Sequence, residues 1–179
     1  MPASSDTVWL DKATAFTVII SSGDRYMGPA SQIGISSGGT ATLNVAGRTL
    51  TAPSNYTYLV VGNASQGVLQ VSGGTVNLVS DSIWLGYGAT GTINMSSGTI
   101  NCRNIDAGLT ANGHPIINMT GGQINVSEII FWPENAGASA DIHLDGGIIS
   151  AGYLFGPNWT TFDASSSTVN LDISGGTLT

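Results

Sequence analysis

The stretch GTINMSSGTIN, residues 91–101, decides the fold because related versions of it recur along the chain. They are GVLQVSGGTVN at 67–77, PIINMTGGQIN at 115–125, ADIHLDGGIIS at 140–150 and TVNLDISGGTLT at 168–179. Aligned on the small residue at their centre, seven copies follow one another at spacings of 24–29 residues. Self-similarity at such a period is typical of solenoids. The seven anchors are Ser22, Gly47, Gly73, Ser97, Gly121, Gly146 and Gly175.

Apolar and polar residues alternate on both sides of each anchor. Ile93-Asn94-Met95 precedes the anchor of the quoted copy, and Ile100-Asn101-Cys102 follows it. A period of two with many β-branched residues indicates strands, and the small pair between them suits a corner. A third strand is predicted in each repeat, as at Ser82–Gly86. We therefore expect an all-β fold: a three-sided parallel β-helix of about seven coils over residues 1–179, forming one domain. The chirality of parallel crossovers favours a right-handed solenoid.

The alternation also assigns the core and the surface. Met95, Ile100, Cys102 and their counterparts should point inward. The polar residues between them should form ladders that run from coil to coil, because stacked amides can hydrogen-bond along the axis. One predicted ladder contains Asn44, Gln70, Asn94, Asn118, His143 and Asp172, and a second contains Asn77, Asn101 and Asn125.

Composition excludes several classes of protein. Only 8% of the residues are charged, with 4 basic against 11 acidic, so a nucleic acid or an anionic membrane is not an expected partner. No apolar run approaches the ~20 residues of a membrane span, and no signal peptide is visible. The single cysteine, Cys102, rules out an internal disulfide and a zinc framework. No cofactor or metal is predicted, although the acidic excess leaves calcium open.

The repeated pattern, as in Gly91–Ile100, resembles the right-handed β-helix repeats of bacterial secreted and surface proteins, such as autotransporter passengers and adhesins. This resemblance implies an extracellular or cell-surface module, part of a longer repeat protein whose adjacent domains are partners. Non-catalytic binding of polysaccharide, or an adhesive scaffold, is the implied function. Two alternatives stay open: a fragment of a carbohydrate-active enzyme (a polysaccharide lyase or glycosidase), and a purely structural stalk.

The third strands lack polar residues at every second position. If Leu59 and Val61, Ile83 and Leu85, and Ile129 and Phe131 point inward, an apolar stripe of Val60, Trp84, Ile130 and Trp132 faces outward. Indoles beside polar groups suit sugar rings. A loop or a neighbouring domain that covers the stripe is the alternative. The candidate ligand-binding residues are Trp84, Tyr87, Asp106, Trp132 and Trp159.

The enzyme alternative rests on the segment ADIHLDGG. In a strand whose Ile142 and Leu144 point inward, Asp141, His143 and Asp145 would point outward together, with Asp172 beside His143 on the next coil. Such a group could carry acid–base chemistry. His114 lies between Gly and Pro in the segment NGHP, and such turn-forming residues predict that it belongs to a loop.

Overall fold

The structure of the protein is a computed structural model, and the residues that it describes are 9–10, 12, 14–28, 30–35, 38–52, 58–107, 110, 112–131, 139–155 and 168–179. Within these ranges the chain is all-β, and its strands belong to a single sheet whose pairs are parallel. No helix long and apolar enough to cross a membrane occurs in this part of the chain. The fold is the parallel β-solenoid that the repeat predicts.

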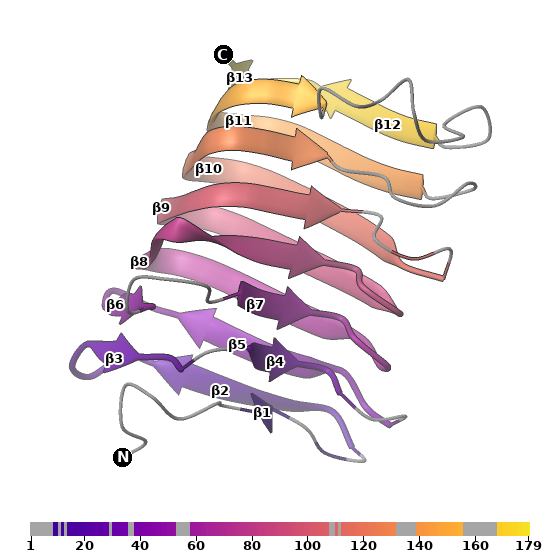
Figure 1. Cartoon of the computed structure of the whole chain (residues 1–179). Helices are drawn as coiled ribbons and strands as arrows, with labels where there is room; N and C mark the ends of the chain where they lie inside the picture. Colours follow the sequence, from indigo (N-terminus) through magenta and orange to yellow (C-terminus); the bar gives the residue numbers. More distant parts are fainter. Residues whose placement is uncertain are drawn as a thin grey trace.

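Short strands form the N-terminal coils, and long strands form the coils that follow (Figure 1). The short strands are β1 Trp9–Leu10, β2 Phe16–Ile20, β3 Arg25–Tyr26, β4 Ser31–Ile33, β5 Ala41–Val45, β6 Thr49–Thr51 and β7 Tyr58–Val61. The long strands are β8 Gly67–Leu85, β9 Thr90–Ala107, β10 His114–Phe131 and β11 Ser139–Phe155. The last strands are β12 Thr168–Ile173 and β13 Thr177–Leu178.

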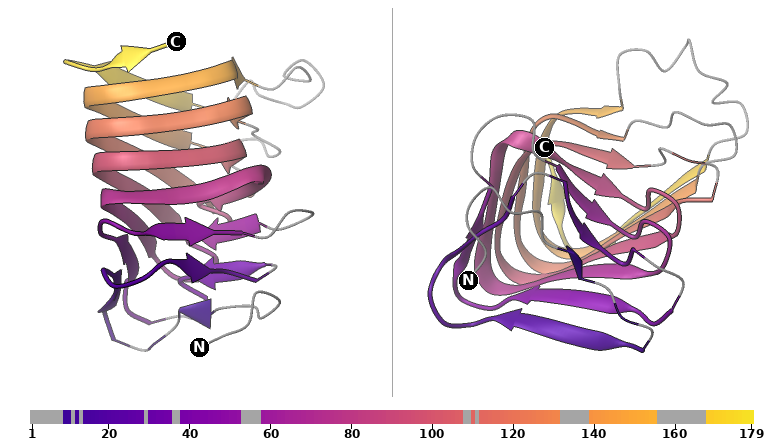
Figure 2. Two further views of the ribbon diagram at one scale, coloured as in Figure 1. Left: turned by 90° about the vertical axis from the view of Figure 1, so that its left-hand side faces the viewer. Right: turned by 60° about the horizontal axis from the view of Figure 1, so that its bottom comes forward.

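Each long strand runs around three sides of the solenoid, and Figure 2 shows this cross-section from the N-terminal end. Between β8 and β9 the register shifts at Val71/Ser72, Ser72/Thr75 and Leu78/Ser82, which separates three straight segments per coil. We call them the first, second and third segments. The number of complete turns is smaller than the seven predicted, because the last repeat contributes just β12 and β13 among the described residues.

The inward residues form one continuous apolar column, as predicted. Met95 and Met119 are 2% and 1% exposed, and Ile100, Ile124 and Leu144 are completely buried. Equivalent side chains lie in register on successive coils, as in the pairing of Met95 with Met119. No single coil could bury its inward pair alone, so stacking of the coils is the source of the core.

The corners depend on glycine where neighbouring coils touch. Gly98 has φ +92°, a left-handed conformation that residues with a Cβ rarely adopt. A Cβ at this position would lie 2.2 Å from the carbonyl oxygen of Gly74 on the preceding coil. The repeat therefore places a small residue where the turn and the coil spacing both require one.

The predicted strand phase is wrong in the third segment of β10. Ile130, expected to point outward, is completely buried and belongs to the core. The register between β10 and β11 shifts between Val126 and Ile129, so an irregularity displaces the alternation by one residue. The side chains of Ile129 and Phe131, and all of Trp132, lie outside the described part. An outward apolar stripe through Ile130 does not exist.

Candidate functional site

Three aromatic rings stack on the third segment. The indole of Trp84 lies parallel to the ring of Tyr58, with 3.9 Å between centroids and 5° between planes. Tyr87 stacks on the same indole at 5.5 Å and 18°. We refer to Tyr58, Trp84 and Tyr87 as the aromatic cluster. It joins two consecutive coils, because Tyr58 lies on β7 and Trp84 on β8.

The strand register brings these rings together. Val60 pairs with Trp84 and Tyr58 pairs with Ser82, so Tyr58 is the diagonal neighbour of Trp84. Tyr87 follows Gly86, whose φ of +68° turns the chain at the end of β8. Thr110 donates a hydrogen bond from its hydroxyl to the Tyr87 carbonyl oxygen, which ties this turn to the next coil. The turn and the register together hold the cluster.

Exposure within the cluster is graded. Tyr87 is 37% exposed, whereas Trp84 and Tyr58 are half-buried. Tyr58 covers part of one indole face at van der Waals distance, so the ring that the cluster offers most freely is Tyr87. The outer face of the third segment is covered next to the cluster. Val60, the register partner of Trp84 on β7, is only 3% exposed.

The other predicted ligand-binding residues have mixed outcomes. Asp106 pairs in register with Trp84 on the adjacent strand, which places a carboxylate beside the indole, and it is half-buried. Trp132 and Trp159 lie outside the described residues. Tyr58 was missed because the sequence marks it only as the first residue of a strand. The signal that could have found it is the 26-residue offset from Tyr58 to Trp84, two more than the 24 residues that separate the register pair Tyr58 and Ser82.

The acidic segment lies on the outer side of β11. His143 and Asp145 are exposed on β11, and His143 pairs in register with Asn118 on one side and Asp172 on the other, as the predicted ladder requires. Asp145 accepts a hydrogen bond from the Ser174 hydroxyl at 2.6 Å. Asp141, partly exposed on the same strand, has its hydrogen-bond partners on the neighbouring coils.

Asp141 bonds to His114 on the preceding coil. His114 Nε2 lies 2.7 Å from Asp141 Oδ2, and its Nδ1 lies 3.0 Å from the Ser139 hydroxyl oxygen. Asn170 on the next coil donates to Asp141 Oδ1 at 2.7 Å. His114 is therefore not a loop residue, since it begins β10. The signal that could have revealed this contact is the repeat period, because Ile116, two residues beyond His114, is the register partner of Asp141.

The surroundings of Asp141 favour its ionised form. The hydrogen bond from Asn170 holds the pKa of its carboxyl below the ordinary value; the bond from His114 and the charges of His114 and His143 lower it further. Partial burial acts in the opposite direction but is outweighed. The carboxylate consequently accepts hydrogen bonds from two coils over the neutral pH range.

Amide ladders run along two sides of the solenoid. Asn118 donates to Asn94 at 2.9 Å on the first segment, and Asn125 donates to Asn101 at 2.8 Å on the second. Asn101 in turn lies 3.5 Å from its acceptor in Asn77. These contacts confirm the predicted ladders at their asparagine pairs, whereas Asn44 accepts a hydrogen bond from the Ser72 hydroxyl at 2.9 Å.

The described residues present neither a metal-binding cluster nor a reactive thiol. Among them, no three His, Cys, Asp or Glu side chains converge on a point where they could hold a metal ion. Cys102 is buried in the core, and this burial, with the Asp106 charge as a smaller cause, raises the pKa of its thiol far above the ordinary range. Cys102 is thus an inert core residue at neutral pH.

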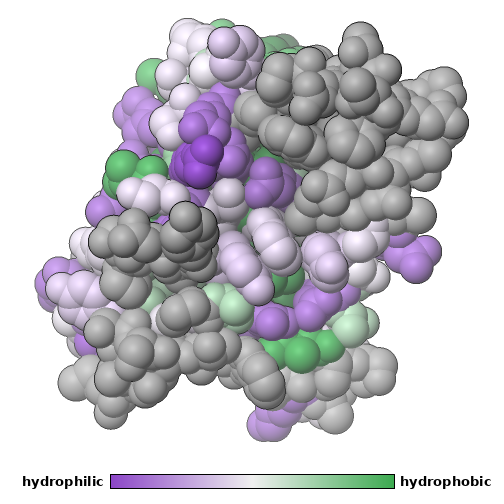
Figure 3. Space-filling view, viewed as in Figure 1, coloured by the Kyte–Doolittle hydropathy of each residue, from purple (hydrophilic) through white to green (hydrophobic). Residues whose placement is uncertain are grey.

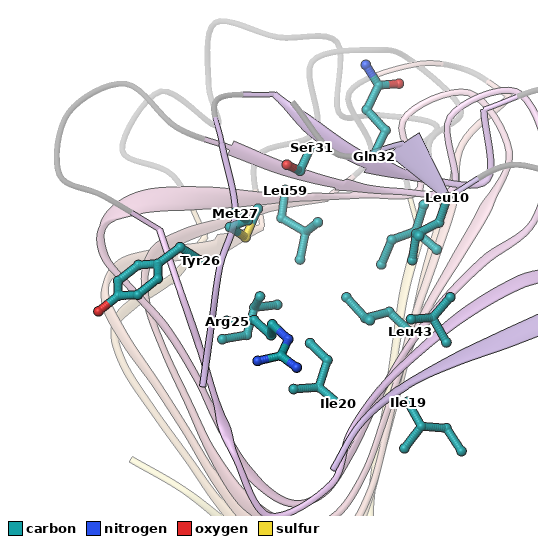
Figure 4. Close-up of a pocket in the computed structure, with 13 residues that line it drawn as sticks. Leu10, Ile19, Ile20, Arg25, Tyr26, Met27, Ser31, Gln32, Leu43 and Leu59 are labelled. Carbon is teal, nitrogen blue, oxygen red and sulfur yellow. The ribbon is translucent and has the colours of Figure 1, made fainter. Parts of the chain in front are cut away.

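An apolar cavity of about 230 Å³ opens at the N-terminal end. Ile20, Met27 and Leu59 point into it, while Tyr26 points away (Figure 4). Its lining is the end of the same inward column that forms the core, and Arg25 is the charged residue among the described ones that line it. The described lining is mainly apolar, so it lacks the convergent polar groups of a catalytic pocket.

Few of the chain's residues are charged, 8% in all. On the face shown in Figure 3, hydrophobic residues appear in small separate patches among hydrophilic and neutral ones. We found no significant match to this chain among protein-family models, curated proteins or solved structures. The class is therefore defined by the fold alone: a parallel β-solenoid with one aromatic cluster and one His–Asp–Ser network among its described residues.

Proposed function

We propose that this chain is a β-solenoid module whose aromatic cluster binds polysaccharide non-catalytically. The observation that carries the proposal is the parallel stack of Trp84 on Tyr58, with Tyr87 against the same indole. Sugar rings stack on aromatic faces and hydrogen-bond at their edges, and Asp106 lies on the strand beside Trp84. The stack orders Tyr87 before a ligand arrives, which reduces the entropy cost of binding.

The neutral surface supports a carbohydrate ligand over a charged one. With 8% charged residues, the module offers mainly hydroxyl and amide groups, which match the hydroxyl groups of a glycan. An extracellular or cell-surface location, in a bacterial surface or secreted protein, fits this composition and belongs to the same proposal. Weak binding is expected because the cluster is partly exposed and encloses little of a ligand.

A purely structural stalk is the second candidate. The amide ladders favour it, since they bond one coil to the next and use polar residues that could otherwise contact ligands. A stalk needs no ligand, so the two candidates differ in one measurable property.

Affinity electrophoresis through gels that contain neutral or acidic polysaccharides tests the proposal. Wild-type protein should be retarded by at least one glycan, and Trp84→Ala and Tyr87→Ala should abolish the retardation while leaving the β-sheet circular dichroism unchanged. Tyr153→Ala is the matched control, because Tyr153 is a 64% exposed tyrosine outside the cluster. Retardation that survives both cluster substitutions would refute the site, and a wild type that no glycan retards would favour the stalk.

A further inference from the structure

Ser139, His114 and Asp141 form a hydrogen-bonded chain on the outer side of the first segment. Ser139 and Asp141 are two residues apart on β11 and so face the same side. His114, at the start of β10, lies 3.0 Å from the Ser139 hydroxyl through Nδ1 and 2.7 Å from Asp141 through Nε2. All three side chains are partly open to solvent, which a site for a soluble substrate requires.

The charge of Asp141 determines which atoms donate and which accept in the two hydrogen bonds of His114. An ionised Asp141 can only accept, so the hydrogen of the neutral imidazole lies on Nε2 and points at the carboxylate. The Nδ1 lone pair then faces Ser139 and accepts its hydroxyl hydrogen. Asn170 holds the other carboxylate oxygen at 2.7 Å, which fixes the orientation of Asp141. Nucleophile, base and orienting carboxylate follow one another as in acyl-transfer enzymes, but with the ring nitrogens exchanged: Nδ1 faces the serine and Nε2 faces the carboxylate.

We propose that Ser139 is a nucleophile activated by His114, with Asp141 as the positioning residue, and that the site hydrolyses short-chain carboxylic esters. Among the described residues, the outward side chains next to the network are mostly polar: Asn118, His143, Thr168 and Asn170, with Ile116 as the apolar one. A small acyl group such as acetyl suits these surroundings. This activity lies beyond glycan binding and uses a different segment of the coil.

The reaction has two balanced halves. Ser139 Oγ attacks the ester carbonyl carbon, and its proton passes to His114 Nδ1. The bond between the carbonyl carbon and the alcohol oxygen then breaks, and the departing alcohol takes that proton, leaving an acyl ester on Ser139. Water attacks this ester and gives a proton to Nδ1; Ser139 Oγ leaves with that proton, and the carboxylic acid is released.

Labelling with a fluorophosphonate tests the nucleophile without knowledge of the natural ester. Wild-type protein should add one phosphonyl group, located on Ser139 by peptide mass spectrometry. Its labelling should be about 100-fold faster than that of protein unfolded in urea, the order expected for base assistance. Ser139→Ala should remove the label, whereas Ser150→Ala, a half-buried serine on the same strand, should not.

Two further variants separate catalysis from folding. His114→Gln and Asp141→Asn should each slow labelling at least 10-fold, and hydrolysis of p-nitrophenyl acetate should fall in parallel. Circular dichroism identifies a variant that fails to fold. The labelling rate of the other variant is then compared with that of the wild type. Labelling of the wild type no faster than of unfolded protein, or undiminished labelling of both folded variants, would overturn the proposal. Trp84→Ala should leave the labelling rate unchanged, so the result is independent of glycan binding.

Discussion

Trp84 and Tyr58 lie face to face across two coils, with 3.9 Å between their ring centroids and 5° between their planes. The contact arises because the parallel register makes them diagonal neighbours on β7 and β8. It links stability to the proposed binding surface, since the ring that supports Tyr87 is itself held by the preceding coil.

Removal of Tyr58 should therefore affect both properties. Tyr58→Ala should lower the free energy of unfolding by about 1–2 kcal/mol through the lost stacking and buried area, and it should weaken glycan retardation because Trp84 loses its support. Urea denaturation and affinity electrophoresis measure the two effects. Tyr153→Ala should change neither appreciably; a Tyr58→Ala protein with unchanged stability and binding would show that the stack is unimportant.

A charge in the core should unfold the module. Ile100 is completely buried in the column, and an unpaired carboxylate there costs several kcal/mol. Ile100→Asp should lose its cooperative thermal transition, as followed by circular dichroism. Ile148→Asp is the control, because Ile148 is 42% exposed and should tolerate the same change. Equal stability of the two variants would mean that the assignment of inward positions is wrong.

The corner glycines should differ in their tolerance of alanine. Gly98→Ala meets both a left-handed φ and the Gly74 carbonyl oxygen at 2.2 Å, so it should destabilise the protein by about 3 kcal/mol or more. Gly47 has φ +76° but nothing within 4 Å of its added Cβ, so Gly47→Ala should cost only about 1 kcal/mol. Chemical denaturation separates the two values. Equal losses would indicate that contact between coils adds nothing at the corner.

The amide ladders should stabilise the fold, because their asparagines bond one coil to the next. Asn101 bonds to Asn77 and to Asn125, so Asn101→Ala removes the donor to the Asn77 side-chain oxygen and the acceptor of the Asn125 amide. We expect a loss of about 1–2 kcal/mol in urea denaturation. Ser80→Ala, at an exposed position, should be neutral. A neutral Asn101→Ala would show that water replaces the ladder without cost.

Asp141 should make stability depend on pH in the acid range. Its pKa is lower in the folded protein than in the unfolded chain, so its stabilising contribution is present above the unfolded value near pH 4 and is lost as the pH falls through the folded value. Thermal melts from pH 6 to pH 2 should show a smaller decline for Asp141→Asn than for the wild type. Identical declines would show that the bonds from Asn170 and His114 do not depend on the carboxylate charge.

The alternation and the period predicted most of the architecture. They identified the strands, the inward column through Ile100 and the amide ladders, because these features repeat with each coil and need only local spacing. The prediction for Ile130 is wrong because an irregularity in β10 shifts the alternation by one residue. The sequence contains no signal that indicates such an extra residue. Periodicity constrains a strand only while the pairing is regular.

The candidate sites depended on the tertiary structure. Trp84 and Asp106 were named from the sequence, but Tyr58 was not, and His114 was assigned to a loop although it begins β10. The sequence by itself determined which residues face outward in each regular segment. Only the stacking of coils decided which outward side chains meet: Tyr58 with Trp84, and His114 with Asp141 and Ser139. Residues 25 positions apart become neighbours through the parallel register, and that register is set by core packing along the whole solenoid.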